Sequence, residues 1–157
     1  MISTVARYLI PAALAHLPER MDTPEAHVML LAIAGQESGF QHRRQMGGGP
    51  GRSLWQFEQP GLRGVLRHPA SEAHAQHVID ALLYAGRPHF ALHEALEHND
   101  ILSCAMARLL LYTDPQPLPA VGDAEGAWGY YLRLWRPGRP HPGRWAANYA
   151  AAVTIEV

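Results

Sequence analysis

Residues 23–39, TPEAHVMLLAIAGQESG, decide the expected fold. Thr23 is a favourable N-cap residue, and Pro24 suits the first position of a helix. Residues 28–34 are apolar on every side, which is typical of a helix buried in a protein core. Gly39 then favours the end of that helix. The stretch therefore predicts a core helix that carries Glu37 near its carboxyl end.

Most of the remaining chain also has helical patterning, interrupted by proline and glycine. Further helices are predicted over residues 3–17, 60–68, 71–84, 88–98, 100–112, 123–135 and 143–153. The glycine-rich segment 41–59 favours a loop or a short β-hairpin, and residues 136–142 favour a turn-rich loop. We therefore expect one mainly α-helical domain over residues 1–157, with a small β-hairpin beside the functional site.

Composition excludes several classes of protein. The chain has 157 residues, 48% hydrophobic and 17% charged, which is typical of one globular domain. Its formal net charge of −1 argues against a general nucleic-acid-binding protein. Residues 8–15 are apolar but lack a small-residue cleavage site, so they indicate a first helix and not a signal peptide. We expect a monomer made in the cytoplasm without a signal peptide, with no stable membrane insertion.

The basic residues are thirteen arginines in an uneven distribution, and there is no lysine. One cluster lies within residues 43–67 and another within residues 133–144. If the two clusters meet in space, they would form a basic face suited to an anionic polymer. The alternative is that they are solvated surface arginines.

Glu37 is the main candidate for chemistry. A carboxyl group at the end of a buried apolar helix is partly desolvated, which raises its pKa. The partial negative charge at a helix carboxyl end acts in the same direction. A carboxylic acid that is still protonated near neutral pH can protonate a glycosidic oxygen. The alternative is that Glu37 is simply the last polar residue of its helix.

Residues 53–57, SLWQF, follow Glu37 after the glycine-rich loop. Strand-like alternation would place Leu54 and Gln56 on one side and Trp55 and Phe57 on the other. Sugars bind to aromatic faces and to amides that hydrogen-bond their hydroxyl and acetamido groups, and Trp55 and Gln56 provide both. The alternative is a core tryptophan with Gln56 at the surface. We interpret Leu54 and Phe57 as core residues.

The sequence GQESGF at 35–40, followed by GRSLWQ at 51–56, resembles the lysozyme-like superfamily. The pattern is closest to soluble lytic transglycosylases and goose-type lysozymes, and the small size resembles bacteriophage or prophage lysis and virion-associated enzymes. The resemblance covers residues 28–58. It implies that Glu37 is the catalytic acid, that Ser38 is the serine beside it, and that Gln56 is the glutamine lining the substrate groove. Trp55 takes a position usually held by Met or Phe, and Ser53 one usually held by Gly.

The resemblance implies cleavage of the β-1,4 bond between N-acetylmuramic acid and N-acetylglucosamine in peptidoglycan. The partner would be peptidoglycan glycan strands, reached in the periplasm, outside the cell or from a virion, and no cofactor would be needed. Glycosidases normally use two carboxylates, for which Glu58 is the nearest second candidate and Asp114 and Glu125 are others. Lytic transglycosylases need only one, so Glu37 would act first as acid and then as base. The alternative class is a non-catalytic lysozyme-fold protein that binds the cell wall or belongs to a virion.

The tyrosine motif of that family, Ala-Tyr-Asn-Ala-Gly, has no clear counterpart in this sequence. Tyr112 and Tyr149 are the candidates for its role. Among the C-terminal aromatic residues, Trp128, Tyr131 and Trp135 share one helical face and are expected in the core. Tyr130 lies off that face, so we predict that it faces the substrate.

Ten histidines raise the possibility of a metal site. His74 and His77 are three positions apart on an expected helix, but no cysteine or HExxH-type pattern accompanies them. We therefore expect surface histidines and no bound metal. Cys104 lies in an apolar run and is expected to be a buried small hydrophobic residue.

Overall fold

Helix α3 (Pro24–Ser38) is the core helix that the sequence predicts. The computed structural model describes residues 1–156. The Thr23 hydroxyl accepts a hydrogen bond from the Ala26 amide at 3.2 Å and so caps the helix. Gly39 ends the helix in the left-handed conformation, at φ 58°. Residues 28–34 are all at most 1% exposed, so the helix is buried around its whole circumference.

The rest of the described chain is mainly helical, as predicted. Helices α1 (Ile2–Thr4) and α2 (Ile10–Leu14) are joined by a π-helical turn (Val5–Leu9) into one N-terminal helix. The others are α4 (Gln59–Arg67), α5 (Glu72–Ala81), α6 (His89–His98), α7 (Asp100–Tyr112), α8 (Ala124–Trp135) and α9 (Pro142–Glu156), with short 3₁₀ turns at Glu19–Met21 and Met46–Gly48. Helix α5 ends before the expected Tyr84, and Leu83 just beyond it has a left-handed backbone, at φ 67°.

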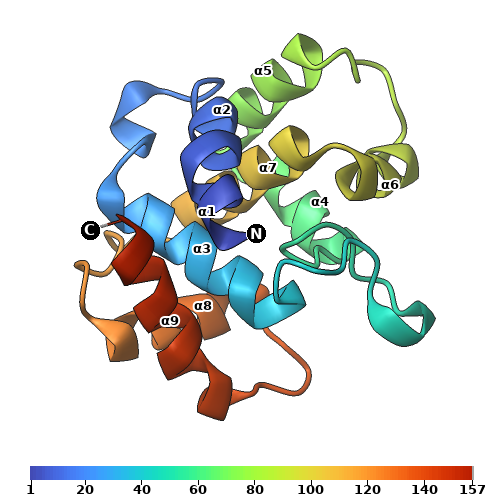
Figure 1. Ribbon diagram of the computed structural model, residues 1–157. Helices are drawn as coiled ribbons and strands as arrows, with labels where there is room; N and C mark the ends of the chain where they lie inside the picture. Colours follow the sequence, from blue (N-terminus) through green and yellow to red (C-terminus); the bar gives the residue numbers. More distant parts are fainter. Residues whose placement is uncertain (157) are drawn as a thin grey trace.

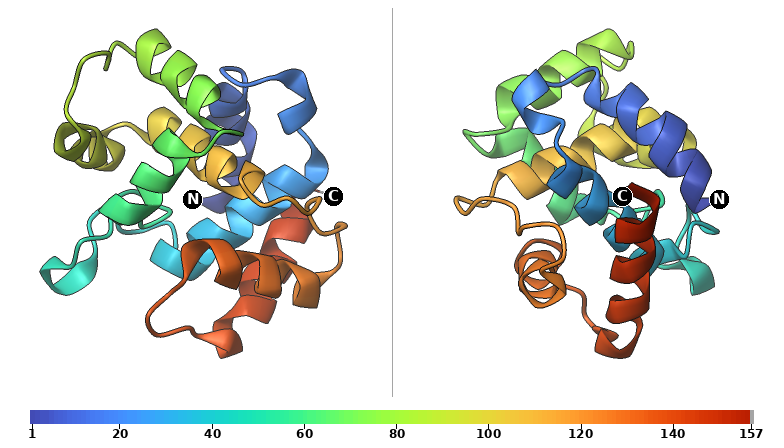
Figure 2. Two further views of the ribbon diagram at one scale, coloured as in Figure 1. Left: turned by 180° about the vertical axis from the view of Figure 1, so that it is seen from behind. Right: turned by 60° about the vertical axis from the view of Figure 1, so that its left-hand side comes forward.

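Two buried helices organise one domain. Helix α7 packs against α2, α4, α5 and α6, while α3 packs chiefly against α9 (Figure 1). Helix α8 packs against α9, and the views from behind and from the side show these two helices together at one end of the molecule (Figure 2). The carboxyl end of α3 therefore lies beside the α8–α9 pair and next to the loop that follows it.

In residues 41–59, where the sequence favours a loop or a short β-hairpin, the structure has no continuous pair of strands. This segment has only two isolated antiparallel bridges, Arg44 with Arg52 and Arg52 with Phe57. Ser53 and Gln56 have left-handed φ angles of 75° and 51°, which interrupt an extended strand. The side chains consequently do not alternate, and Leu54 and Trp55 are both buried.

Among residues 1–156, no helix has the length and apolar character required to cross a lipid bilayer.

Candidate active site

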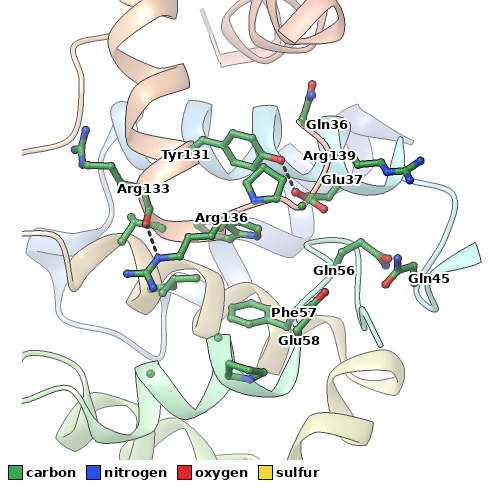
Figure 3. Close-up of a pocket in the computed structure, with 18 of the residues that line it drawn as sticks. Gln36, Glu37, Gln45, Gln56, Phe57, Glu58, Tyr131, Arg133, Arg136 and Arg139 are labelled. Carbon is green, nitrogen blue, oxygen red and sulfur yellow. Dashed lines mark hydrogen bonds between the residues drawn. The ribbon is translucent and has the colours of Figure 1, made fainter. Parts of the chain in front are cut away.

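Residues from six parts of the chain line one cavity of about 780 Å³. They come from the carboxyl end of α3, the loop of residues 45–58, the α4 helix, the carboxyl end of α7, the carboxyl end of α8 with the loop after it, and the start of α9. Figure 3 shows the Glu37 side chain projecting into this cavity, with Gln56 and Glu58 on the side formed by the loop.

Glu37 is the penultimate residue of α3 and is half-buried. Burial raises the pKa of its carboxyl group because the charged form loses solvation. A hydrogen bond from Tyr131 opposes that rise, and the charge of Glu58 adds a smaller rise. The result is a net raised pKa, which keeps this carboxyl protonated at a higher pH than an ordinary glutamate.

Tyr131 is a residue of the candidate site that the sequence interpretation did not place there. Its hydroxyl donates a 2.5 Å hydrogen bond to Oε1 of Glu37. Its ring is stacked on Trp145, with centroids 5.2 Å apart and planes at 14°. Burial, followed by the nearby Glu37 carboxylate, raises the pKa of Tyr131, so its phenol remains a hydrogen-bond donor. The helical pattern correctly predicts a buried ring, and the available signal was that a buried tyrosine hydroxyl needs a polar partner.

The prediction that Tyr130 faces the substrate is wrong. Tyr130 is 3% exposed, and its hydroxyl lies 3.0 Å from both the Leu111 and the Gln116 carbonyl oxygens. It therefore joins α8 to the end of α7 and to the segment after it.

Neither tyrosine suggested for the family motif reaches the cavity. The Tyr112 ring is near the side chains of Arg20 and Arg108, each with its guanidinium carbon 5.9 Å from the ring centroid, and it does not line the cavity. The Tyr149 hydroxyl accepts a hydrogen bond from the Gly122 amide at 3.0 Å. The tyrosine hydroxyl that contacts Glu37 is thus that of Tyr131 in α8, and not that of Tyr112 or Tyr149.

Trp55 and Ser38 were predicted to contact the substrate, and the structure places both inside the protein. Trp55 is completely buried, and its indole nitrogen donates a 2.9 Å hydrogen bond to the Leu30 carbonyl of α3. The Ser38 hydroxyl donates to the Ala34 carbonyl at 3.0 Å and accepts from the Phe40 amide at 3.2 Å. Trp55 thus joins the loop to the middle of α3, and Ser38 joins the last turn of α3 to the residue after Gly39.

Gln56 does line the cavity with Glu37, and Gln45 joins it there. Figure 3 shows the two amide side chains close together. The Gln56 side-chain nitrogen donates to the Ser53 carbonyl at 2.7 Å, and the Gln45 side-chain oxygen accepts from the Gly51 backbone amide at 2.9 Å. Gly51 leaves room for this arrangement, because a Cβ there would lie 2.8 Å from the Gln56 side-chain oxygen.

Of the three candidate second carboxylates, Glu58 alone lines the cavity among the described residues. It is exposed and lies across the cavity from Glu37 (Figure 3). Asp114 is instead paired with Arg133 at 3.1 Å, and Glu125 is an exposed residue of the first turn of α8.

The two arginine clusters have different environments. In the first, Arg43 pairs with Asp100 at 2.7 Å, and Arg44 and Arg52 both approach Glu97, at 3.1 and 3.7 Å. None of that cluster lines the cavity, so the two clusters do not share it. The second cluster does line it, with Arg133, Arg136, Arg139 and Arg144.

Gln36 fixes the loop that carries the second cluster. Its side-chain nitrogen donates to the His141 carbonyl at 2.9 Å, and its side-chain oxygen accepts from Asn148 of α9 at 2.9 Å. The residue next to the acid thus holds the facing wall of the cavity to α3.

Within residues 1–156, no cluster of three or more His, Cys, Asp or Glu residues has the arrangement to hold a metal ion. Cys104 is fully buried, and burial raises the pKa of its thiol. It lies in the core segment of α7, away from the cavity.

Comparisons with protein-family models, curated proteins and solved structures found no match to this chain.

Proposed function

We propose that this protein is a peptidoglycan-degrading glycosidase with a lysozyme-like fold. It would cleave the β-1,4 bond between N-acetylmuramic acid and N-acetylglucosamine, as a lytic transglycosylase or a muramidase. The proposal depends on one observation: the cavity contains a carboxyl group, that of Glu37, whose pKa is raised by burial and which Tyr131 holds in place.

The sequence resemblance and the cavity geometry support each other. The resemblance assigns Glu37 as the acid and Gln56 as a groove residue, and both side chains line one cavity. The family motif also contains a tyrosine, for which this sequence has no clear counterpart, and the hydroxyl beside Glu37 is that of Tyr131.

In the proposed reaction, a glycan strand lies in the cavity with its glycosidic oxygen near Glu37. The protonated carboxyl group donates its proton to that oxygen as the bond to the sugar breaks. Tyr131 restricts the orientation of the carboxyl group, because one of its oxygens is held by the phenol. The Gln45 side-chain nitrogen and the Gln56 side-chain oxygen, which are not used in the internal hydrogen bonds described above, are available to hydrogen-bond sugar hydroxyl or acetamido groups.

Two outcomes are possible after bond cleavage. If Glu58 activates a water molecule, the product is a hydrolysed strand. If the 6-hydroxyl of the sugar closes an anhydro ring, Glu37 accepts its proton and no second carboxylate is needed. The site of action would be the cell wall, with delivery from a virion as one route.

The decisive experiment compares the parent protein with the Glu37→Gln variant on purified peptidoglycan. We expect the variant to keep its circular dichroism spectrum and to lose about 10²–10⁴-fold in the rate of turbidity loss. Glu125→Gln is the matched control, because Glu125 is an exposed carboxylate outside the cavity, and it should clear at the parent rate. Equal clearing by the parent and Glu37→Gln would reject the proposal.

Mass spectrometry of the released fragments distinguishes the two outcomes, because anhydro ends indicate transglycosylation and reducing ends indicate hydrolysis. A parent protein that cosediments with peptidoglycan without releasing fragments would instead support the non-catalytic, wall-binding alternative.

A further inference from the structure

The wall of the cavity beside Glu37 carries three arginines that have no role in the proposed bond cleavage. Arg136, Arg139 and Arg144 line the cavity along the loop after α8 and the start of α9. In the view of Figure 3, Arg136 and Arg139 extend to opposite sides of Glu37. A glycan strand that crosses the cavity past the acid would therefore meet a guanidinium group on each side.

These three arginines lack carboxylate partners within residues 1–156. The arginines at positions 43, 44, 52 and 133 each have an ion-pair partner, whereas those at 136, 139 and 144 have none. The carboxyl groups that line the cavity are Glu37 and Glu58 alone among the described residues. The uncompensated charge makes this wall attractive to an anion.

Several prolines and hydrogen bonds restrain the loop that carries Arg136 and Arg139. Three of its residues are prolines, at 137, 140 and 142, which restrict the backbone. The Arg136 amide donates to the Leu132 carbonyl at 3.2 Å, and the guanidinium nitrogen Nε of Arg136 donates to the Arg133 carbonyl at 3.3 Å. Gln36 fixes the far end of the loop through His141. A restrained loop loses little conformational entropy when a ligand binds to it.

We propose that Arg136, Arg139 and Arg144 form a recognition site for carboxylates carried by the glycan, so that the cavity selects an acidic glycan over a neutral one such as chitin. The inference depends on the proposed peptidoglycan substrate and goes beyond it, because it assigns the specificity to these three residues. Guanidinium groups bind carboxylates with two parallel hydrogen bonds when the geometry permits. In peptidoglycan, the free carboxylates are those of the stem peptides, and a lactyl carboxylate is free only on a sugar that lacks a stem peptide.

The test measures binding separately from cleavage by placing every variant in the Glu37→Gln background. Cosedimentation is measured with peptidoglycan freed of phosphate-containing polymers, with the same material after its carboxyl groups are amidated, and with chitin. We expect Glu37→Gln to bind native peptidoglycan about tenfold more tightly than the amidated material, with binding weakened by added salt. Adding R136Q and R139Q should reduce binding to native peptidoglycan to the level of the amidated material.

The control variant adds R7Q and R87Q, which remove the same charge from exposed sites outside the cavity. It should bind like Glu37→Gln alone. Competition with free stem peptides, and separately with glycan strands stripped of them so that their lactyl carboxylates are free, identifies the source of the carboxylate. Strong competition by the peptides indicates the stem-peptide carboxylates, and strong competition by the stripped strands indicates the lactyl carboxylates of sugars that lack a peptide.

Equal binding by Glu37→Gln with and without R136Q and R139Q would overturn this inference, as would equal binding to native and amidated peptidoglycan. Equal losses in the R7Q/R87Q control would also overturn it, because the effect would then be general charge attraction. If the parent protein releases no fragments while binding still depends on Arg136 and Arg139, the glycosidase proposal fails and the recognition site stands.

Discussion

The Tyr131 hydroxyl donates a 2.5 Å hydrogen bond to the Glu37 carboxyl group, although the two residues lie 94 positions apart in the chain. The bond connects α8 to the carboxyl end of α3. It also places two opposing influences on one carboxyl group: burial raises the pKa of Glu37, and the hydrogen bond lowers it. The pH range in which Glu37 can act as an acid is therefore set by residues on two helices.

Tyr131→Phe is expected to move the alkaline limit of activity to higher pH. Removing the phenol removes an interaction that lowers the pKa of Glu37, so the carboxyl group should remain protonated further into the alkaline range. The measurement is the pH dependence of kcat/KM for fragment release, whose alkaline limb reports the acid of the free enzyme. Tyr8→Phe is the control, because Tyr8 is exposed on the N-terminal helix. A shift to lower pH would contradict this account of the hydrogen bond.

Glu58→Gln is expected to shift the alkaline limb of the pH dependence of kcat/KM in the opposite direction from Tyr131→Phe. The charge of Glu58 raises the pKa of Glu37, so its removal should move the alkaline limb to lower pH. The size of the activity loss at the optimum also identifies the reaction. A loss of about 10²–10⁴-fold indicates that Glu58 is the base of a hydrolase, whereas a transglycosylase should retain most of its activity. An unchanged pH profile would show that Glu58 does not influence Glu37.

Glu37→Gln is expected to stabilise the protein at neutral pH relative to the parent. The folded state raises the pKa of Glu37 above its ordinary value of 4.5, so the unfolded state ionises more readily. This destabilisation of the parent protein is absent below about pH 4.5, where Glu37 is protonated in both the folded and the unfolded state. It grows as the pH rises toward the pKa of Glu37 in the folded state. Urea unfolding at pH 4 and pH 7.5 measures the free energy of unfolding of both proteins. A stability difference that does not increase with pH would contradict the raised pKa.

Trp55→Ala is expected to destabilise the protein by about 3–5 kcal/mol, because it empties a fully buried aromatic site and removes the hydrogen bond to Leu30. Trp55→Phe should lose less stability and should still release peptidoglycan fragments where it is folded. Urea unfolding and the turbidity assay check the two parts. Normal stability combined with lost activity in Trp55→Phe would instead indicate that the indole contacts the sugar.

The predictions that succeeded depend on interactions within a few residues of each other. Thr23 caps α3 through a residue three positions away, and the left-handed Gly39 closes it at the other end. By contrast, Glu37 and Gln56 lie 19 positions apart and line the same cavity only because the chain folds. The hairpin was not predictable from alternation, because Ser53 and Gln56 adopt left-handed backbone conformations in a segment stabilised by its neighbours.

The assignment of the tyrosines failed for a different reason. Tyr130 and Tyr131 are adjacent, so they point about 100° apart around α8. Both are buried, and their burial alone does not say which one meets α3 and which one meets the segment after α7. That choice depends on the rotation of α8 about its axis, which is set by packing against α9 and by the stacking of Tyr131 on Trp145.

The sequence by itself determined a buried helix that carries an acidic residue near its carboxyl end, because apolar patterning and capping residues act over short distances along the chain. The tertiary structure alone decided which side chains surround that acid. Tyr131 and Gln56 line the cavity, whereas their neighbours Tyr130 and Trp55 are buried elsewhere, and only the second of the two arginine clusters reaches it. The side chains around the acid come from segments that are distant in sequence. Their positions depend on how helices pack in three dimensions, and no local pattern of residues encodes that directly.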